Sequence, residues 1–184
     1  MMKIRILLLL LVSLLLMSCN TIWDETYVTP DPDTDAEGYY QTLYGSFTLK
    51  YKVESGTHLR CKLSANGSGW IAVGFAPAAM MKDANVIIGY VHADQGFIRD
   101  DFGTSHTEHE SDLSLGGSSD VELLTAYEAN GKTHLEFRIP LDSGDSKDRP
   151  LVIGSEYPII FASGNEDDFD SYHSAIGTGV IQVR

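Results

Sequence analysis

Two adjacent methionines and one histidine are the side chains of this sequence best suited to holding a transition metal. Met80 and Met81 lie in a polar connection between two apolar segments, 69–75 and 86–91, and His173 follows Tyr172 in a loop rich in Gly and Asp. A thioether is a soft ligand that suits haem iron, and imidazole is a common metal ligand. From position alone, packing is the commoner role for such methionines and solvation the commoner state of a loop histidine, so both interpretations stay open.

Two further segments crowd ligand-type side chains. His106-Thr107-Glu108-His109-Glu110 combines imidazoles with carboxylates, and Glu166-Asp167-Asp168-Phe169-Asp170 has carboxylates enough for Ca²⁺. The second segment lacks the spacing and central glycine of an EF-hand loop, and a solvated loop is the simpler interpretation of both. The motifs Gly-x-Ser-x-Gly, Gly-x-x-x-x-Gly-Lys-[Ser/Thr] and His-Glu-x-x-His are absent. We therefore predict no catalytic residue and do not expect the chain to be an enzyme by itself.

The elements that must position these residues are short strands. Alternating apolar and polar residues, as in Phe47-Thr48-Leu49-Lys50-Tyr51, are typical of a half-buried antiparallel strand. Turn residues separate the strands, and Asn130-Gly131 is a strong hairpin signal. The pattern predicts an all-β antiparallel sandwich over 39–184, with nine strands at 47–53, 58–64, 69–75, 84–92, 96–102, 120–127, 133–140, 157–162 and 176–183.

The first residues of the chain have a different character. Lys3 and Arg5 precede the apolar run 6–17, which is too short for a membrane span but suits the core of a signal peptide. Leu16-Met17-Ser18-Cys19 resembles the lipobox of bacterial lipoproteins, in which the cysteine is acylated, for example with palmitate, and begins the mature chain. We expect a signal peptide over 1–18 and a lipid anchor at Cys19 in the bacterial cell envelope. Asn20 in place of Asp favours the outer membrane. A plain secretory signal or an uncleaved anchor is the alternative.

An acidic tether is predicted to follow the anchor, over 19–38. It contains six acidic residues, no basic residue, and two prolines that favour an extended chain. The formal net charge of −13 becomes −15 when Lys3 and Arg5 leave with the signal, because all 26 acids lie beyond Cys19. Such a charge argues against binding nucleic acid. With Cys19 acylated, Cys61 has no disulfide partner, and we expect it to be a buried thiol.

Five ordered motifs lie between residues 44 and 183. They are Gly-Trp-Ile-Ala-Val-Gly-Phe from Gly69, Met-x-x-Ala-Asn from Met81, Asp-Val-Glu-Leu-Leu from Asp120, Phe-Arg-Ile-Pro-Leu-Asp-Ser-Gly-Asp from Phe137, and Tyr172-His173. Together they resemble the DOMON domain, a family named for the amino-terminal domain of dopamine β-monooxygenase. The resemblance implies an immunoglobulin-like β-sandwich that binds haem b or a sugar. In the haem-binding branch Met and His are the axial ligands, which assigns these roles to Met81 and His173.

The resemblance leaves several points open. The family motif usually reads Met-x-x-Ala-Asp, so Met81 is a better ligand candidate than Met80, while Asn85 departs from the usual Asp. Arg60, Arg99 and Lys82 are alternative partners for the haem propionates. Two strong axial ligands leave no open position for O₂, so such a haem would pass electrons to a redox partner protein. The alternative is a carbohydrate-binding module that uses exposed aromatics such as Trp70, Tyr90, Phe97 or Tyr172.

Overall fold

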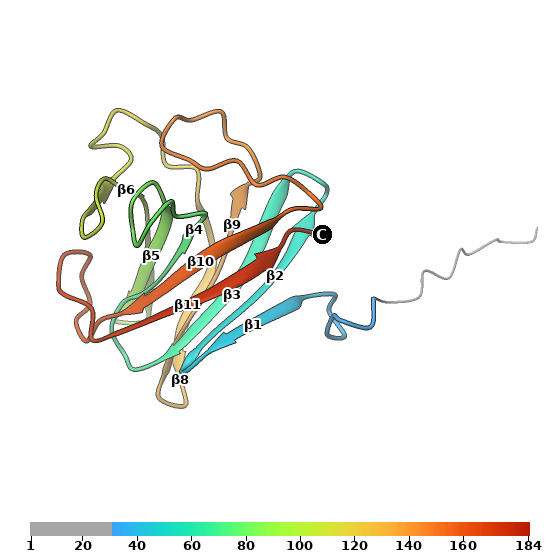
Figure 1. Cartoon of the computed structure of the whole chain (residues 1–184). Helices are drawn as coiled ribbons and strands as arrows, with labels where there is room; N and C mark the ends of the chain where they lie inside the picture. The colour runs from blue at the N-terminus through green and yellow to red at the C-terminus, as the bar shows by residue number, and fades with distance from the viewer. Residues whose placement is uncertain (1–30) are drawn as a thin grey trace, which may run out of the picture.

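The computed structural model describes residues 31–184, which form two antiparallel sheets packed face to face (Figure 1). The five-stranded sheet has the order β1-β2-β3-β9-β8, and the six-stranded sheet the order β11-β10-β4-β5-β6-β7. The described residues contain no helix, and therefore none that could cross a membrane. The strands are β1 Tyr40–Tyr44, β2 Phe47–Glu54, β3 His58–Asn66, β4 Ile71–Phe75, β5 Asn85–His92, β6 Gln95–Gly103, β7 His109–Ser111, β8 Glu122–Ala129, β9 Lys132–Pro140, β10 Glu156–Ser163 and β11 Ala175–Gln182.

The core between the sheets follows from the alternation of the sequence. In β2, β3 and β9 every second side chain is buried, and the intervening ones face solvent. β4 and the first five residues of β5 are instead buried on both faces. The six-stranded sheet is therefore covered on its outer side as well, and this second covered face carries the candidate site.

The predicted β-sandwich is confirmed, and all nine expected strands are present with ends shifted by no more than two residues. The sequence interpretation missed β1 and β7. β7 has only three polar residues at the edge of its sheet, and β1 is a largely exposed edge strand. Neither has the buried alternation on which the prediction depended.

Tight turns connect the strands as their residues require. Asn130 and Gly131 have φ values of 53° and 71° and join β8 to β9, as a hairpin with a type I′ turn requires. The hairpin between β5 and β6 turns at Ala93 and Asp94, which both adopt positive φ. Gly96 lies inside β6, where a Cβ would fall 2.5 Å from that of Ala126.

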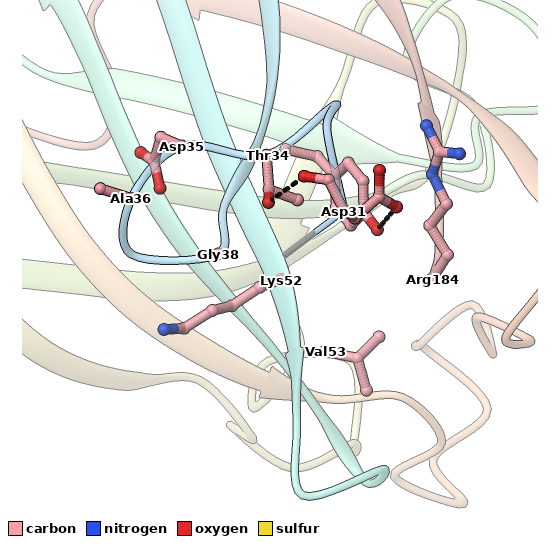
Figure 2. A pocket seen from close by; sticks show the side chains of 9 residues that line it. Asp31, Thr34, Asp35, Ala36, Gly38, Lys52, Val53 and Arg184 are labelled. Carbon is pink, nitrogen blue, oxygen red and sulfur yellow. Dashed lines mark hydrogen bonds between the residues drawn. The ribbon is translucent and has the colours of Figure 1, made fainter. Parts of the chain in front are cut away.

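The predicted tether is described only from Asp31 onward, and this part contacts the sandwich. Asp35 lies 2.8 Å from the Lys50 ammonium group, and Glu37 lies 2.5 Å from that of Lys62. Asp31 accepts a hydrogen bond from Tyr40, and the segment borders a hollow of about 440 Å³ (Figure 2). Residues 31–38 are thus held against β2 and β3. The predicted signal peptide, Cys19 and the earlier part of the tether lie outside the described residues.

Candidate functional site

The outer face of the six-stranded sheet carries a second apolar cluster, separate from the main core. Its side chains come mainly from β4 and β5, and most are small or branched: Trp70, Ala72, Ala84, Val86 and Ile88, flanked by Tyr90, Ile160, Ala162 and Phe169. Gly74 adds no side chain to this face, and a Cβ there would lie only 2.8 Å from the Ile160 side chain. An apolar cluster of this kind is suited to contact an apolar ligand once the loop that covers it moves aside.

The connection from β4 to β5 borders this face and carries both methionines. Its backbone turns tightly, with positive φ at Ala76, Met80 and Asp83. The Asp83 amide donates to the carbonyl of Gly103 at 2.8 Å, and the Gly103 amide donates to the carbonyl of Ala84 at 2.9 Å. The end of β6 therefore fixes the Met81 backbone.

The two methionines differ in burial. Met80 has 62% of its surface exposed, whereas Met81 is half-buried. A side chain that approaches the protein interior is the better placed of the two to hold a ligand within the fold, which favours Met81.

The connection from β10 to β11 carries Tyr172 and His173. The Glu166 carbonyl accepts from the Trp70 amide at 3.0 Å, and Ser171 accepts from the Trp70 indole at 2.9 Å. Phe169 packs against Tyr90 with ring centroids 4.8 Å apart, which places part of this loop over the apolar face. The His173 side chain itself is exposed.

The two loops leave opposite ends of the same strand pair. In the antiparallel register of β4 and β10, Phe75 lies opposite Ile159 and Ile71 lies opposite Ser163. The Met81 loop therefore follows Phe75 at one end, and the His173 loop follows Ser163 at the other (Figure 1). The four residue steps of β4 between these ends cover about 14 Å, so the loops flank the apolar face from two sides.

Of the three basic residues considered as propionate partners, only Arg99 and Lys82 belong to this region. Arg60 lies on β3 of the other sheet and pairs with Glu54 and Glu136. Arg99 lies over the Phe169 ring at 4.6 Å and makes two hydrogen bonds to Asp101. Lys82 is exposed in the Met81 loop.

The expectation that Trp70 is an exposed aromatic is wrong. Its side chain is buried, because the backbone of Gly69 and Gly164 closes over it, and a Cβ on Gly164 would lie 2.1 Å from the indole nitrogen. Tyr90 and Phe97 are half-buried and stacked at 5.0 Å. Tyr172 is 90% exposed and is the most accessible of the four.

The two polar segments singled out in the sequence make local contacts. His109 lies 2.6 Å from Asp101, and, although burial opposes ionisation, His109 and Arg99 hold the pKa of Asp101 below its ordinary value. In the other segment, Asp168 accepts from the amides of Asp170 and Ser171, which lowers the pKa of Asp168. Neither segment supplies a group of three metal-ligating side chains within the part of the chain that the structure describes.

A different set of carboxylates does come together, and sequence reasoning missed it. Asp100, Asp112 and Asp148 each offer an oxygen, and these atoms all lie within 4.8 Å of one another. Asn85 donates to Asp148 at 2.5 Å, so the residue that departs from the family motif borders this cluster. The one signal in the sequence is an acidic pair, Asp100-Asp101, inside a predicted strand.

The sandwich and its motif-bearing loops agree with a match to a family model. The DOMON domain model matches residues 42–164, and the chain belongs to this family. Among curated proteins, the chain is 28% identical over 153 residues to DBH-like monooxygenase protein 1 of Mus musculus and 25% identical over 114 residues to the Homo sapiens protein of that name. These alignments cover 82% and 62% of this chain but only 23% and 18% of those proteins, so the chain spans about a quarter of their length or less.

Two solved structures share the fold. The cytochrome b domain of pyranose dehydrogenase from Coprinopsis cinerea superposes with a TM-score of 0.58, covering 78% of this chain and 80% of that one. The cytochrome domain of Myriococcum thermophilum cellobiose dehydrogenase superposes with a TM-score of 0.60, covering 85% and 87%. Each is 13% identical in sequence to this chain. The likeness therefore establishes the β-sandwich fold.

Proposed function

We propose that this chain is a lipid-anchored DOMON domain that binds haem b between Met81 and His173 and transfers electrons outside the cytoplasm. The observation that carries the proposal is the placement of the two loops at opposite ends of β4, with an apolar face between them. The cytochrome domains that share the fold add support.

The residues of this face fit a haem in their chemistry. The cluster offers apolar contacts, a thioether and an imidazole border it, and the half-buried Arg99 guanidinium, which is paired with Asp101, lies beside it. When bound between such ligands, haem iron supplies one-electron redox chemistry at a raised potential. Phe169 lies over part of the face, so its loop would have to adjust to admit the ring.

The residues of this chain would act by holding and shielding the group. Met81 and His173 would hold the iron through a thioether and an imidazole, and the branched side chains Val86, Ile88 and Ile160 would exclude water. With the iron held by these two side chains, the domain would be an electron carrier and not an enzyme by itself. A redox partner protein is therefore part of the proposal.

Membrane attachment is proposed from the sequence. A signal peptide over 1–18, acylation of Cys19 and a location in the bacterial cell envelope, with the outer membrane favoured, follow from the lipobox resemblance. Acyl chains bind membranes at about 0.8 kcal/mol per buried methylene. Labelling with a radioactive fatty acid tests the anchor, and equal labelling of the wild-type chain and Cys19→Ala would contradict it.

The test of haem binding is an absorption spectrum of the purified full chain, reconstituted with haemin and recorded oxidised and reduced. We expect a low-spin Soret band in the wild type that is lost in His173→Ala and altered in Met81→Ala. Met80→Ala is the matched control, because it removes the exposed neighbouring thioether, and it should keep the wild-type spectrum. A wild-type chain that takes up no haem would overturn the proposal.

A carbohydrate-binding module is the second candidate function, and the exposure of Tyr172 favours it. This ring is 90% exposed beside His173, and aromatic platforms of this kind are typical of sugar sites. Glycan-array binding that is lost in Tyr172→Ala but kept in Met81→Ala would favour this function over haem. Absence of glycan binding, together with haem uptake, would exclude it.

A further inference from the structure

A buried cluster of acidic side chains lies away from the apolar face and is not used by the proposed haem site. Asp100 comes from β6, Asp112 follows β7, and Asp148 lies in the connection between β9 and β10. Asp100 and Asp112 are 1% and 0% exposed, and Asp148 is half-buried. Three carboxylates withdrawn from water at this separation repel one another strongly unless something neutralises them.

Hydrogen bonds within the protein satisfy only part of this cluster. The Asp120 amide donates to Asp100 Oδ2 at 2.9 Å, and Ser143 and Asn85 donate to Asp148. Asp100 Oδ1 and both carboxylate oxygens of Asp112 have no partner. Buried polar atoms are normally satisfied, so these oxygens indicate a missing positive group.

The side chain of Asn85 gives an independent indication. Asn85 is buried, with only 5% of its surface exposed, and its side-chain amide donates a hydrogen bond to Asp148. Its amide oxygen has no partner either. Asn85 is a neutral side chain bonded to the cluster, and its unpaired buried oxygen can supply a further oxygen ligand to a cation.

The charges around the cluster do not neutralise it. Asp120 and Asp145 add negative charge, while Lys147 is the cation that acts on Asp112. The Lys147 ammonium group lies 5.5 Å from the centre of the Phe102 ring. Arg99 is already bonded to Asp101. Asp100 and Asp112 are both withdrawn from water, so holding both charges is costly without a further cation.

We propose that Asp100, Asp112 and Asp148, with the amide oxygen of Asn85, form a Ca²⁺ site. The ion would join β5 and β6 to the segment after β7 and to the connection between β9 and β10. Calcium binds oxygen ligands at about 2.3–2.6 Å, so two ligands on opposite sides of one ion are separated by about 4.8 Å. The three carboxylate oxygens lie within that limit. The set contains no thiolate or imidazole, which the sites of Zn²⁺ usually include, and Mg²⁺ prefers a smaller octahedral site with several waters.

Such an ion would stabilise the domain and fix the start of β5. Asn85 begins that strand and follows the Met81 loop by a few residues. The ion would also hold the connection that contains Asp148 against β6. The site is independent of haem binding and would stand if the haem proposal failed.

The test is isothermal titration calorimetry with CaCl₂, and separately MgCl₂, on the purified full chain after EDTA treatment, with thermal melts in parallel. We expect one Ca²⁺ per chain and a melting temperature raised by roughly 5–10 °C at a 100-fold excess of free Ca²⁺ over its Kd. Asp112→Asn should weaken Ca²⁺ binding at least tenfold, which at the same free Ca²⁺ concentration reduces the thermal shift to about half or less.

Asp94→Asn is the matched control, because it removes the same charge in the exposed turn between β5 and β6, and it should bind Ca²⁺ as the wild type does. If Asp112→Asn does not fold, Asp148→Asn, which is less buried, takes its place in the comparison. Absence of a thermal shift and of binding heat in the wild type would overturn the proposal. So would an Asp112→Asn chain that binds normally, or a site that takes Mg²⁺ in preference to Ca²⁺.

Discussion

Gly103 lies so close to Met81 that a Cβ at position 103 would fall 1.7 Å from the Met81 carbonyl oxygen. The contact is with backbone, which cannot rotate out of the way as a side chain can. A residue at the end of β6 thus determines where the Met81 loop can lie, although it is far from Met81 in the sequence.

Gly103→Ala is therefore expected to displace the Met81 loop and to destabilise the domain by about 1–3 kcal/mol, the cost of overpacking a tight site. Urea unfolding of the purified chain measures this loss. Gly179→Ala is the comparison, since its Cβ would meet the Thr42 side-chain methyl at 2.8 Å, which can move. An equal loss in both variants would contradict a special role for Gly103.

The hydrogen bond from the Trp70 indole to Ser171 is expected to hold the His173 loop. Trp70→Phe and Ser171→Ala each remove it, and each should cost about 0.5–1.5 kcal/mol and increase amide exchange in residues 164–174. A double-mutant cycle separates the bond from the loss of indole volume. If the two losses simply add, the bond contributes nothing to the loop.

Acid should release the segment that docks on β2. A hydrogen bond from Lys50, followed by the Tyr39 amide, lowers the pKa of Asp35 from 3.8 to about 2. A lowered pKa in the folded state gives a stabilisation that is complete above pH 4 and is lost as the pH falls towards 2. The difference in melting temperature between wild type and Asp35→Asn should therefore shrink between pH 5 and pH 2. With Asp94→Asn, which removes a carboxylate in an exposed turn, no such convergence is expected.

Cys61 should be unreactive in the folded chain. Its side chain is fully buried in β3, and burial raises the pKa of the thiol well above its ordinary value. We expect no reaction with Ellman's reagent at pH 8 until the chain is unfolded. Cys61→Ser should cost about 1–3 kcal/mol, because it buries a hydroxyl in an apolar core. Rapid labelling of a native Cys19→Ala chain, in which Cys61 is the remaining thiol, would contradict the placement of this strand.

The sandwich could be predicted because its central strands carry their own pattern. Phe47 to Val53 alternates in burial as it alternates in sequence, and Asn130-Gly131 makes the expected turn. Trp70 was misjudged because its cover comes from Gly164, a residue distant in the chain. The acidic cluster could not be foreseen, since Asp100, Asp112 and Asp148 are separated in sequence and only the folded loops bring them together. Met81 and His173 were assigned as haem ligands from the family motifs, because the local pattern around each residue is equally typical of packing or solvation.

β1 lies beside β11, which places both ends of the described chain on the same side of the sandwich. Thr42 donates to the Val180 carbonyl, a Cβ on Gly177 would meet Tyr44, and Arg184 lies 3.3 Å from Asp33. The chain therefore enters and leaves the sandwich at one pole, and the loop with Tyr172 and His173 occupies the opposite pole (Figure 1). An approaching protein can reach that loop without contacting the pole where Asp33 and Arg184 lie. A tag or partner domain fused after Arg184 would, in turn, crowd the N-terminal pole and leave His173 open.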